Sequence, residues 1–152
     1  MSTLKTALSE VKAALNGNSA INSWCQENFG RIPKIFIGID PKNPPEMEKN
    51  TPMICIGTGV RYREPAQAYI VHALDVACSI ECNEIIVTGQ VEEYTGINLV
   101  DEFALMVEKA VTKRFNSKGI PGTQEPSMTD SYQHPFYEAV WTYLIRSASR
   151  LS

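Results

Sequence analysis

The stretch that decides the fold is residues 67–88, which read QAYIVHALDVACSIECNEIIVT. Its apolar residues alternate with the period of two that is typical of a strand, although Ile70, Leu74 and Cys78 also fit one face of a helix. The β-branched content favours a strand. We therefore predict a long strand followed by another over 84–88, with a hairpin turn at residues 81–83. Since an average strand has only about 5–6 residues, we expect this arm to bulge or project.

Two amphipathic helices are predicted ahead of this stretch, within residues 1–30. Apolar residues recur every three or four positions over 4–15, and Gly17 supplies a stop. A second apolar face covers 21–29 and ends at Gly30, which suits a left-handed C-terminal cap. We expect these helices to form a hairpin or a bent pair.

Residues 32–94 are predicted to supply most of the strands. Isoleucines alternate over 35–39 and the run stops at Asp40-Pro41. The next stretch, 40–51, holds three prolines among polar and charged residues, so it can neither bury surface nor pair its backbone. The strand pattern resumes at 53–56. We expect two strands joined by a long, polar, exposed loop.

The C-terminal part is predicted to hold one helix and one strand. The helix covers 97–115, where apolar residues form one face and most charged residues lie off it. Glycine and proline over 116–131 indicate a mobile loop. A final strand is expected within 132–148, because Tyr137 and the alternate residues after it form an apolar face.

This order of elements predicts a single α+β domain over residues 1–152, with helices packed on one face of a largely antiparallel mixed sheet. The formal charge of −3 argues against a general nucleic-acid binder, which normally has a basic face. No apolar run approaches the roughly 18 residues of a membrane span, and the N-terminus lacks a secretory pattern. We therefore expect a soluble, intracellular protein with four free thiols.

The sequence offers no clear catalytic or metal site. Gly57-Thr58-Gly59 lacks the third glycine and the following helix that a phosphate loop needs. Cys78 and Cys82 would lie close on a helix, but on a strand their separation is about 13 Å. A zinc site would need further ligands from the two histidines, His72 and His134, and the alternative reading uses Cys78, Cys82 and His72. We expect no catalytic residue, no metal and no cofactor, and a small Cys/His metal-binding domain remains the alternative built on these three residues.

The chain is unusual in its long surface segments, which are the loops over 40–51 and 116–131 and the predicted hairpin near 81–83. They suggest contacts with other chains, because long unstructured loops are often functional. The predicted hairpin near residues 81–84 and the aromatic residues at the end of the 116–131 loop and after it supply part of the candidate interface. A compact cluster of basic and aromatic residues supplies the rest. The candidate interface residues are Arg61, Tyr62, Arg63, Glu81, Glu84, Tyr132 and Phe136. The alternatives for these segments are tolerated insertions and, for the arginines, solvated charges.

The layout resembles one known family. The residues that carry the resemblance are Ile35-Phe36-Ile37-Gly38, Pro52-Met53-Ile54-Cys55-Ile56, Tyr94-Thr95-Gly96 and the helical segment Leu99-Val100-Asp101-Glu102-Phe103. With the N-terminal helix and the closing aromatic strand, they resemble phage tail-terminator proteins, the minor tail protein U group of long-tailed phages and its relatives in Mu-like prophages. The likeness covers nearly the whole chain, as a match of layout.

The resemblance implies a subunit that forms a hexameric ring, caps the tail tube, ends its polymerisation and offers a surface to the head-side neck or connector protein. It implies no catalysis and no cofactor, and a place in the bacterial host cytoplasm during assembly and in the virion tail afterwards. DNA would only pass through, since like charges prevent phosphate contacts. The candidate residues for an acidic lumen are Glu46, Glu48, Glu92 and Glu93. The other reading is a binding module that docks a protein on an exposed sheet edge.

Overall fold

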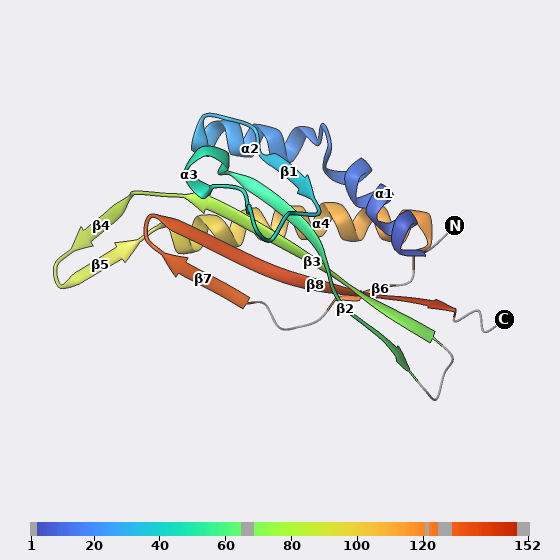
Figure 1. Ribbon diagram of the computed structural model, residues 1–152. Coiled ribbons are helices and arrows are strands. Elements are labelled where there is room, and N and C mark those ends of the chain that lie inside the picture. Colours follow the sequence, from blue (N-terminus) through green and yellow to red (C-terminus); the bar gives the residue numbers. More distant parts are fainter. Residues whose placement is uncertain (1–2, 65–68, 121, 125–128, 149–152) are drawn as a thin grey trace.

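The computed structural model of the chain describes residues 3–64, 69–120, 122–124 and 129–148 (Figure 1). Two helices come first, and a long helix later separates two groups of strands. The helices are α1 (Thr3–Leu15), α2 (Ser19–Phe29), α3 (Met47–Asn50) and α4 (Gly96–Lys118). The strands are β1 (Lys34–Ile37), β2 (Met53–Glu64), β3 (Tyr69–Glu81), β4 (Ile85–Thr88), β5 (Val91–Tyr94), β6 (Gly122–Gln124), β7 (Thr129–Gln133) and β8 (Phe136–Ala148).

Six strands form the main sheet, in the order β1-β2-β3-β8-β6, and β7 also pairs with β8. β1 runs parallel to β2, whereas the other pairs are antiparallel. The ladder between β3 and β8 runs in register from Tyr69 and Ala148 to Glu81 and Phe136. The predicted α+β class with a largely antiparallel mixed sheet is confirmed.

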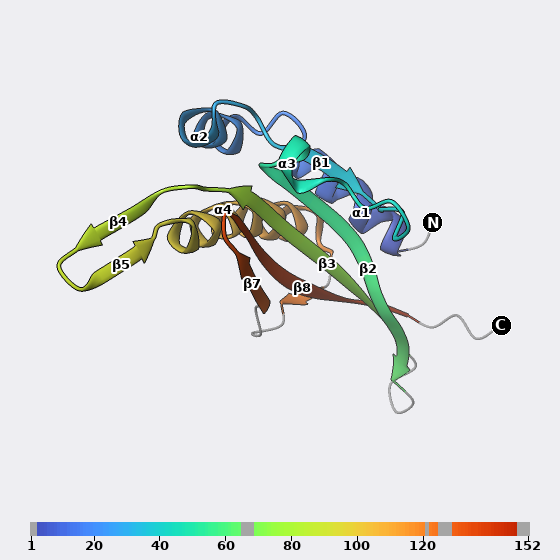
Figure 2. The ribbon, with the colours of Figure 1, turned by 60° about the vertical axis from the view of Figure 1, so that its left-hand side comes forward.

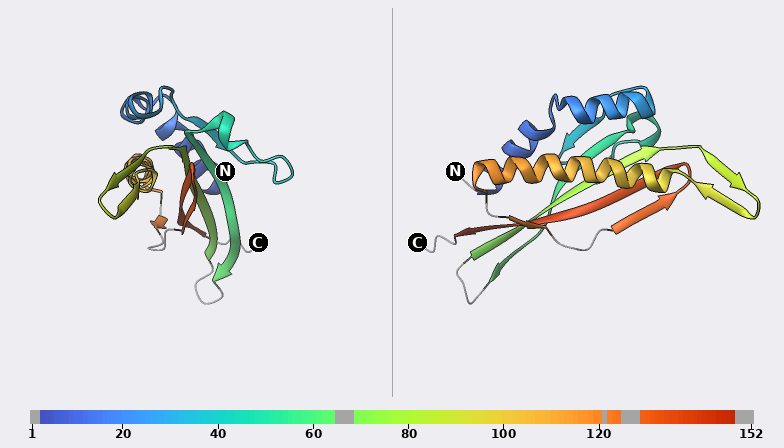
Figure 3. Two further views of the ribbon diagram at one scale, coloured as in Figure 1. Left: turned by 90° about the vertical axis from the view of Figure 1, so that its left-hand side faces the viewer. Right: turned by 180° about the vertical axis from the view of Figure 1, so that it is seen from behind.

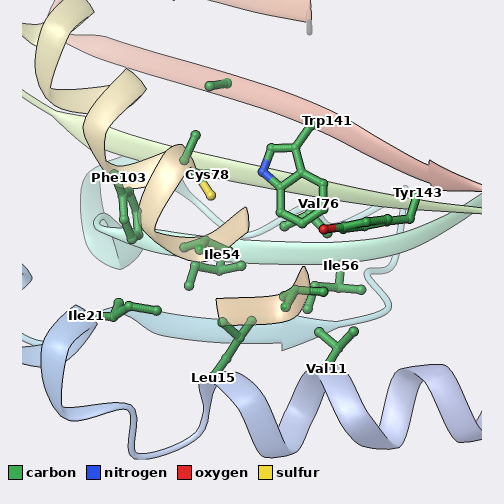
Figure 4. Packing of buried hydrophobic residues seen from close by; sticks show 14 of the residues in the cluster. Val11, Leu15, Ile21, Ile54, Ile56, Val76, Cys78, Phe103, Trp141 and Tyr143 are labelled. Atoms are coloured by element: carbon green, nitrogen blue, oxygen red, sulfur yellow. The ribbon is translucent and has the colours of Figure 1, made fainter. Parts of the chain in front are cut away.

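The helices α1, α2 and α4 lie on one side of the sheet, as the view from behind shows (Figure 3). The core fills the space between them and the sheet (Figure 4). The sheet contributes Ile54, Ile56, Val76, Cys78, Trp141 and Tyr143, and the helices contribute Val11, Leu15, Ile21 and Phe103. The apolar face predicted for the final strand is confirmed, because alternate residues from Tyr137 to Ile145 are buried there.

The helix ends follow the capping signals in the sequence. The side-chain oxygen of Asn18 accepts a hydrogen bond of 3.1 Å from the amide of Ile21, which satisfies a free donor at the start of α2. Gly30 ends α2 in the left-handed conformation, with φ of 74°. The long helix was predicted to end at Phe115 and instead continues to Lys118, where left-handed Gly119 caps it.

The hairpin predicted at residues 81–83 is wrong. β3 pairs with β2 on one side and with β8 on the other, so it has no free edge along which a returning strand could lie. The chain therefore continues past Glu81, where the amide of Cys82 donates to the carbonyl of Pro135 at 2.8 Å. The projecting hairpin predicted for this region does exist, but β4 and β5 form it, further along the chain.

The mobile loop predicted over 116–131 is also wrong in part. β6 and the start of β7 lie in it and pair with β8, while residues 125–128 lie outside the described part of the chain. Pairing along the exposed edge of β8 uses backbone groups alone, so it needs no apolar pattern in the sequence. β7 also occupies the first residues that were assigned to the final strand, which begins at Phe136. The polar loop over 40–51 is largely exposed as expected, but Thr51 at its end is buried and the loop includes the single turn α3.

Candidate interaction site

The most distinctive surface feature is the β4–β5 hairpin, which projects beyond the end of the main sheet (Figures 1 and 2). We call residues 84–95 the arm. All eight residues of its two strands are exposed. The strands are joined by Gly89 and Gln90, and Gly89 has φ of 61°, the positive value that two-residue hairpin turns require.

The arm carries large apolar side chains on both of its faces. Directly paired residues project to the same face. One face holds Ile85, Val87, Glu92 and Tyr94, and the other holds Ile86, Thr88, Val91 and Glu93. The side chain of Val87 is 66% exposed, and that of Val91 is 59% exposed. An isolated two-stranded hairpin is at best marginally stable in water, and clustered exposed apolar residues mark interaction sites.

The arm is anchored where it leaves the body of the protein. The ring of Tyr94 meets the ring of His134 edge-on, with centroids 4.9 Å apart. Nδ1 of His134 lies 2.9 Å from the hydroxyl of Tyr137, which is buried in β8. The amide of Thr95 donates to the carbonyl of Glu84, closing the base of the hairpin. These contacts hold the Tyr94 end of the arm against the turn between β7 and β8 and join the two ends of the arm to each other.

The arm region is also strongly acidic. Residues 81–96 contain four glutamates and no lysine or arginine, which gives a formal charge of −4. Glu81 and Glu84 lie at the base and line a hollow of about 470 Å³ between α2, the arm and α4. Glu92 and Glu93 lie on opposite faces of β5, as their adjacent positions in a strand dictate. The base therefore combines negative charge with a recess, and the tip combines it with apolar side chains.

A second apolar strip lies at the β1 edge of the sheet. Ile32, Ile37 and Ile39 are 56%, 40% and 47% exposed, respectively. β1 pairs with β2 on one side, and within the described ranges no strand pairs with its other side. We call residues 31–39 the β1 edge.

The predicted interface residues fall into two groups. Glu81 pairs with Phe136 in the β3–β8 ladder, and Tyr132 packs against Tyr137 with ring centroids 5.7 Å apart. With Glu84, they lie at the end of the sheet from which the arm projects. The strand pattern predicted at 53–56 stops short of Arg61, Tyr62 and Arg63, but their backbone belongs to the far half of β2, opposite residues 70–72 of β3. Their side chains lie outside the described part.

The four predicted lumen residues do not gather within one chain. Glu46 and Glu48 lie at α3, where Glu46 forms an ion pair of 3.1 Å with Lys49. Glu92 and Glu93 lie in the arm, well away from α3 (Figure 2). They could line one opening only if several copies of the chain came together.

The four cysteines are free thiols, and Cys25 and Cys78 are fully buried in the core. Burial raises the pKa of Cys25 to about 12, and burial followed by the charges of its neighbours raises the pKa of Cys78. Thiols held protonated in this way are poor nucleophiles and poor metal ligands. Across the described residues, no three His, Cys, Asp or Glu side chains come together to hold a metal ion.

The sequence predicts the hairpin turn at residues 81–83, whereas the turn of the arm lies at residues 89–90. The signal that identifies its position is Gly89-Gln90, a two-residue turn that begins with glycine and lies between the β-branched run that ends at Thr88 and the strand that starts at Val91. The β1 edge was predicted as a strand but not as a candidate surface. Its isoleucines follow an ordinary strand pattern, so the sequence carried no signal that they would be exposed.

No protein-family model matches the chain, and no curated protein matches it. In the part of the chain that the structure describes, every helix is too short or too polar to cross a membrane. The function must therefore be inferred from the surfaces of the chain itself and from the layout of its elements.

Proposed function

We propose that the chain is a structural assembly subunit of a phage or prophage tail, which caps the tail tube, ends its polymerisation and provides the head-joining surface. The observation that carries the proposal is the arm, a projecting hairpin with apolar side chains exposed on both faces. The likeness in layout to tail-terminator proteins points in the same direction.

The arm supports an assembly role because its exposure is costly in an isolated chain. Val87 and Val91 would each lose most of their contact with water if a partner covered the arm, and burial stabilises a complex by about 25 cal/mol for every Å² of apolar surface. The anchoring contacts of Tyr94 at the base hold the hairpin outward rather than folded against its own body. Such an element is suited to bridging two subunits.

Identical subunits can form a ring when the surface that one subunit inserts differs from the surface of its neighbour that accepts it. A repeated head-to-tail contact closes into a ring if the rotation between subunits allows it. The arm and the main sheet are different surfaces of one chain, as such a contact requires. In the proposed ring, a hexamer by the family resemblance, the glutamates of α3 contribute to an acidic surround through which DNA passes without being held.

The proposed partners are further copies of the chain, the tail tube protein and the head-side neck or connector protein. Assembly would take place in the bacterial host cytoplasm, and the subunit would remain in the virion tail. The role requires neither catalysis nor a cofactor. Capping and joining depend on surface complementarity alone.

A second candidate function is a binding module that docks a partner protein on an open sheet edge. The exposed isoleucines of the β1 edge favour it, because such an edge can accept an additional strand. Light scattering separates the two functions. A binding module remains monomeric and forms a complex of fixed stoichiometry with one foreign partner, whereas a terminator subunit associates with itself or with the end of a tail tube.

The experiment that tests the proposal combines electron microscopy and genetics. Purified protein, alone and mixed with tail tubes, should form closed rings or caps at tube ends in negative stain. Deletion of the gene from an active phage should give tails of abnormal length. Tails of normal length that fail to join heads would indicate a neck protein instead, and normal virions after deletion would overturn the proposal.

A further inference from the structure

We propose that the arm of one copy docks on the β1 edge of the next copy, so that every subunit donates an arm on one side and receives one on the other. This inference rests on the proposed self-assembly and specifies the contact that would make it. The occupant of the β1 edge is thus a second copy of this chain. Four features of the two surfaces carry the assignment.

The first feature is the matching apolar character of the two surfaces. The arm presents Val87 and Val91, and the β1 edge presents Ile32, Ile37 and Ile39, all of them exposed in the single chain. Two shallow hollows flank the β1 edge. One is lined by Ile32 and by polar residues of α2 that include Glu27, and the other, of about 260 Å³, is lined by both apolar and polar residues, including Phe36, Ile39 and Asp40. Branched side chains from the arm tip can enter such recesses.

The second feature is the direction of the backbone groups of β1. The amide of Lys34 donates to the carbonyl of Pro52 at 3.0 Å, and that of Gly38 donates to the carbonyl of Ile56 at 2.7 Å. Residues in a strand alternate in the side to which their backbone groups point. Those of Ile35 and Ile37 therefore point away from β2, toward the outer side, where a strand of another chain can pair by β-augmentation.

The third feature is opposite charge. Residues 81–96 carry −4, whereas residues 31–42 hold three basic residues and one aspartate, a formal charge of +2. The side chain of Arg31 donates to the carbonyl of Lys49 at 3.1 Å, and Nζ of Lys34 donates to the amide oxygen of Asn50 at 2.9 Å. Because both acceptors are neutral, the two cations keep their charge available for the glutamates of an incoming arm. Complementary charge of this kind fixes register and speeds association.

The fourth feature is the placement of the two surfaces within one chain. The arm points away from the body beyond the ends of β3 and β8, while β1 lies at the side edge of the sheet (Figures 1 and 2). The anchored arm of a chain therefore does not reach its own β1 edge. The pairing can be satisfied only between copies, and because the two surfaces are different, it is head-to-tail.

Disulfide trapping with two separately purified variants tests the contact. Val87→Cys places a thiol on the arm, and Ile37→Cys places one on the β1 edge. Leu105→Cys is the matched control for Ile37→Cys, because Leu105 on α4 is also 40% exposed. The parent chain, with Cys25 and Cys78 buried, reports the background from native thiols. Equal amounts of two variants are oxidised mildly and separated on a non-reducing gel.

The expected result is a covalent dimer in the mixture of the Val87→Cys and Ile37→Cys variants, in at least about tenfold greater yield than with Leu105→Cys, since docking raises the effective concentration of the two thiols. Equal yields in the two mixtures, or no dimer in either, would overturn the inference. A dimer formed by the Val87→Cys variant alone would also overturn it, since it indicates contact between two arms.

The wild-type protein, measured by light scattering at the same concentrations, separates this inference from the proposed function. If wild-type rings form but the arm and the β1 edge do not crosslink, assembly stands and the docking contact is wrong. If neither association nor crosslinking occurs, and tube ends are not capped, both proposals fail.

Discussion

Gly96 lies directly beneath the ring of Tyr137, so close that a Cβ atom built on Gly96 would lie 2.2 Å from Cε2 of the ring. Gly96 is the first residue of α4 and follows the arm immediately, whereas Tyr137 is buried in β8. The missing side chain lets the start of α4 approach the sheet at the point where the arm ends. The hydroxyl of the same tyrosine meets His134, which contacts Tyr94 of the arm.

Gly96→Ala should therefore destabilise the protein, although alanine is the better helix former. Overpacking a filled site costs about 1–3 kcal/mol, against a gain of up to about 1 kcal/mol in helix propensity. We expect a lower midpoint in urea denaturation. Gly57→Ala is the control, because nothing lies within 4 Å of a Cβ built there. An equal effect of both substitutions would contradict the role assigned to the close packing.

Val87→Asp should weaken self-association and leave the stability of the single chain nearly unchanged. Exposed positions tolerate substitution within about 0.5 kcal/mol, and Val87 is exposed at the arm tip. We expect the free energy of association to fall by at least about 1.4 kcal/mol, which means a dissociation constant at least tenfold larger. Analytical ultracentrifugation measures the association, and thermal melting of the dilute protein measures stability. Leu105→Asp, the control on α4, should change the association little.

Two variants with swapped charges, one in the arm and one in the β1 edge, should each associate poorly alone and should regain association when they are mixed. Glu92→Lys alone should weaken association, because it places a cation against the basic edge, and Lys34→Glu alone should do the same. Mixing these two variants restores an opposite-charge pair between copies, so the mixture should associate more tightly than either variant by itself. Added salt should reduce all of these differences, because it screens exposed charges. A mixture no tighter than the single variants would argue against the pairing.

Alkaline pH should destabilise the fold through its buried thiols. The pKa of Cys25 rises from 9.0 to about 12 on burial. Below pH 9 the thiol is protonated in the folded and unfolded chains alike, so its contribution to stability is complete. Between pH 9 and 12 only the unfolded chain loses the proton, so the free energy of unfolding falls by about 1.4 kcal/mol per pH unit for this group. The raised pKa of Cys78 adds to the same trend.

Urea denaturation at a series of pH values checks this dependence. A Cys25→Ala variant should lose stability less steeply between pH 9 and 12 than the parent chain, whatever its stability at neutral pH. Identical slopes for the two proteins would show that the thiol of Cys25 does not carry the effect. Native protein at pH 8 should also leave Cys25 unmodified by thiol reagents, because its side chain is fully buried.

The elements that the sequence predicts well are those whose residues face a single core. The long helix and the final strand repeat their apolar residues with a regular period, and Phe103 and Trp141 are buried as those periods require. The end of α2 was predicted from Gly30 because a left-handed cap is a local preference. Local signals of this kind need no knowledge of the rest of the chain.

The wrong predictions concern strand partners, which depend on residues far apart in the sequence. Ile85 looked like the start of a strand returning along β3, but β2 and β8 occupy both edges of β3. Thr123 and Ser131 lie in polar segments that pair because β8 offers a long edge. The β1 edge became recognisable only once Ile37 and Ile39 were found exposed, since an isoleucine in a strand pattern is usually buried.

The continuity between β3 and β4 has a mechanical consequence. The chain passes from Glu81 through Cys82 and Asn83 directly into the arm, which bends away from the line of β3 (Figure 1). A force that pulls on the arm therefore passes into the central strand β3. There the backbone hydrogen bonds to β2 and to β8 bear the load at the same time, rather than breaking one after another. At its other end the arm leads directly into α4. Tension between neighbouring subunits would thus be distributed over the central strand β3 and the long helix α4.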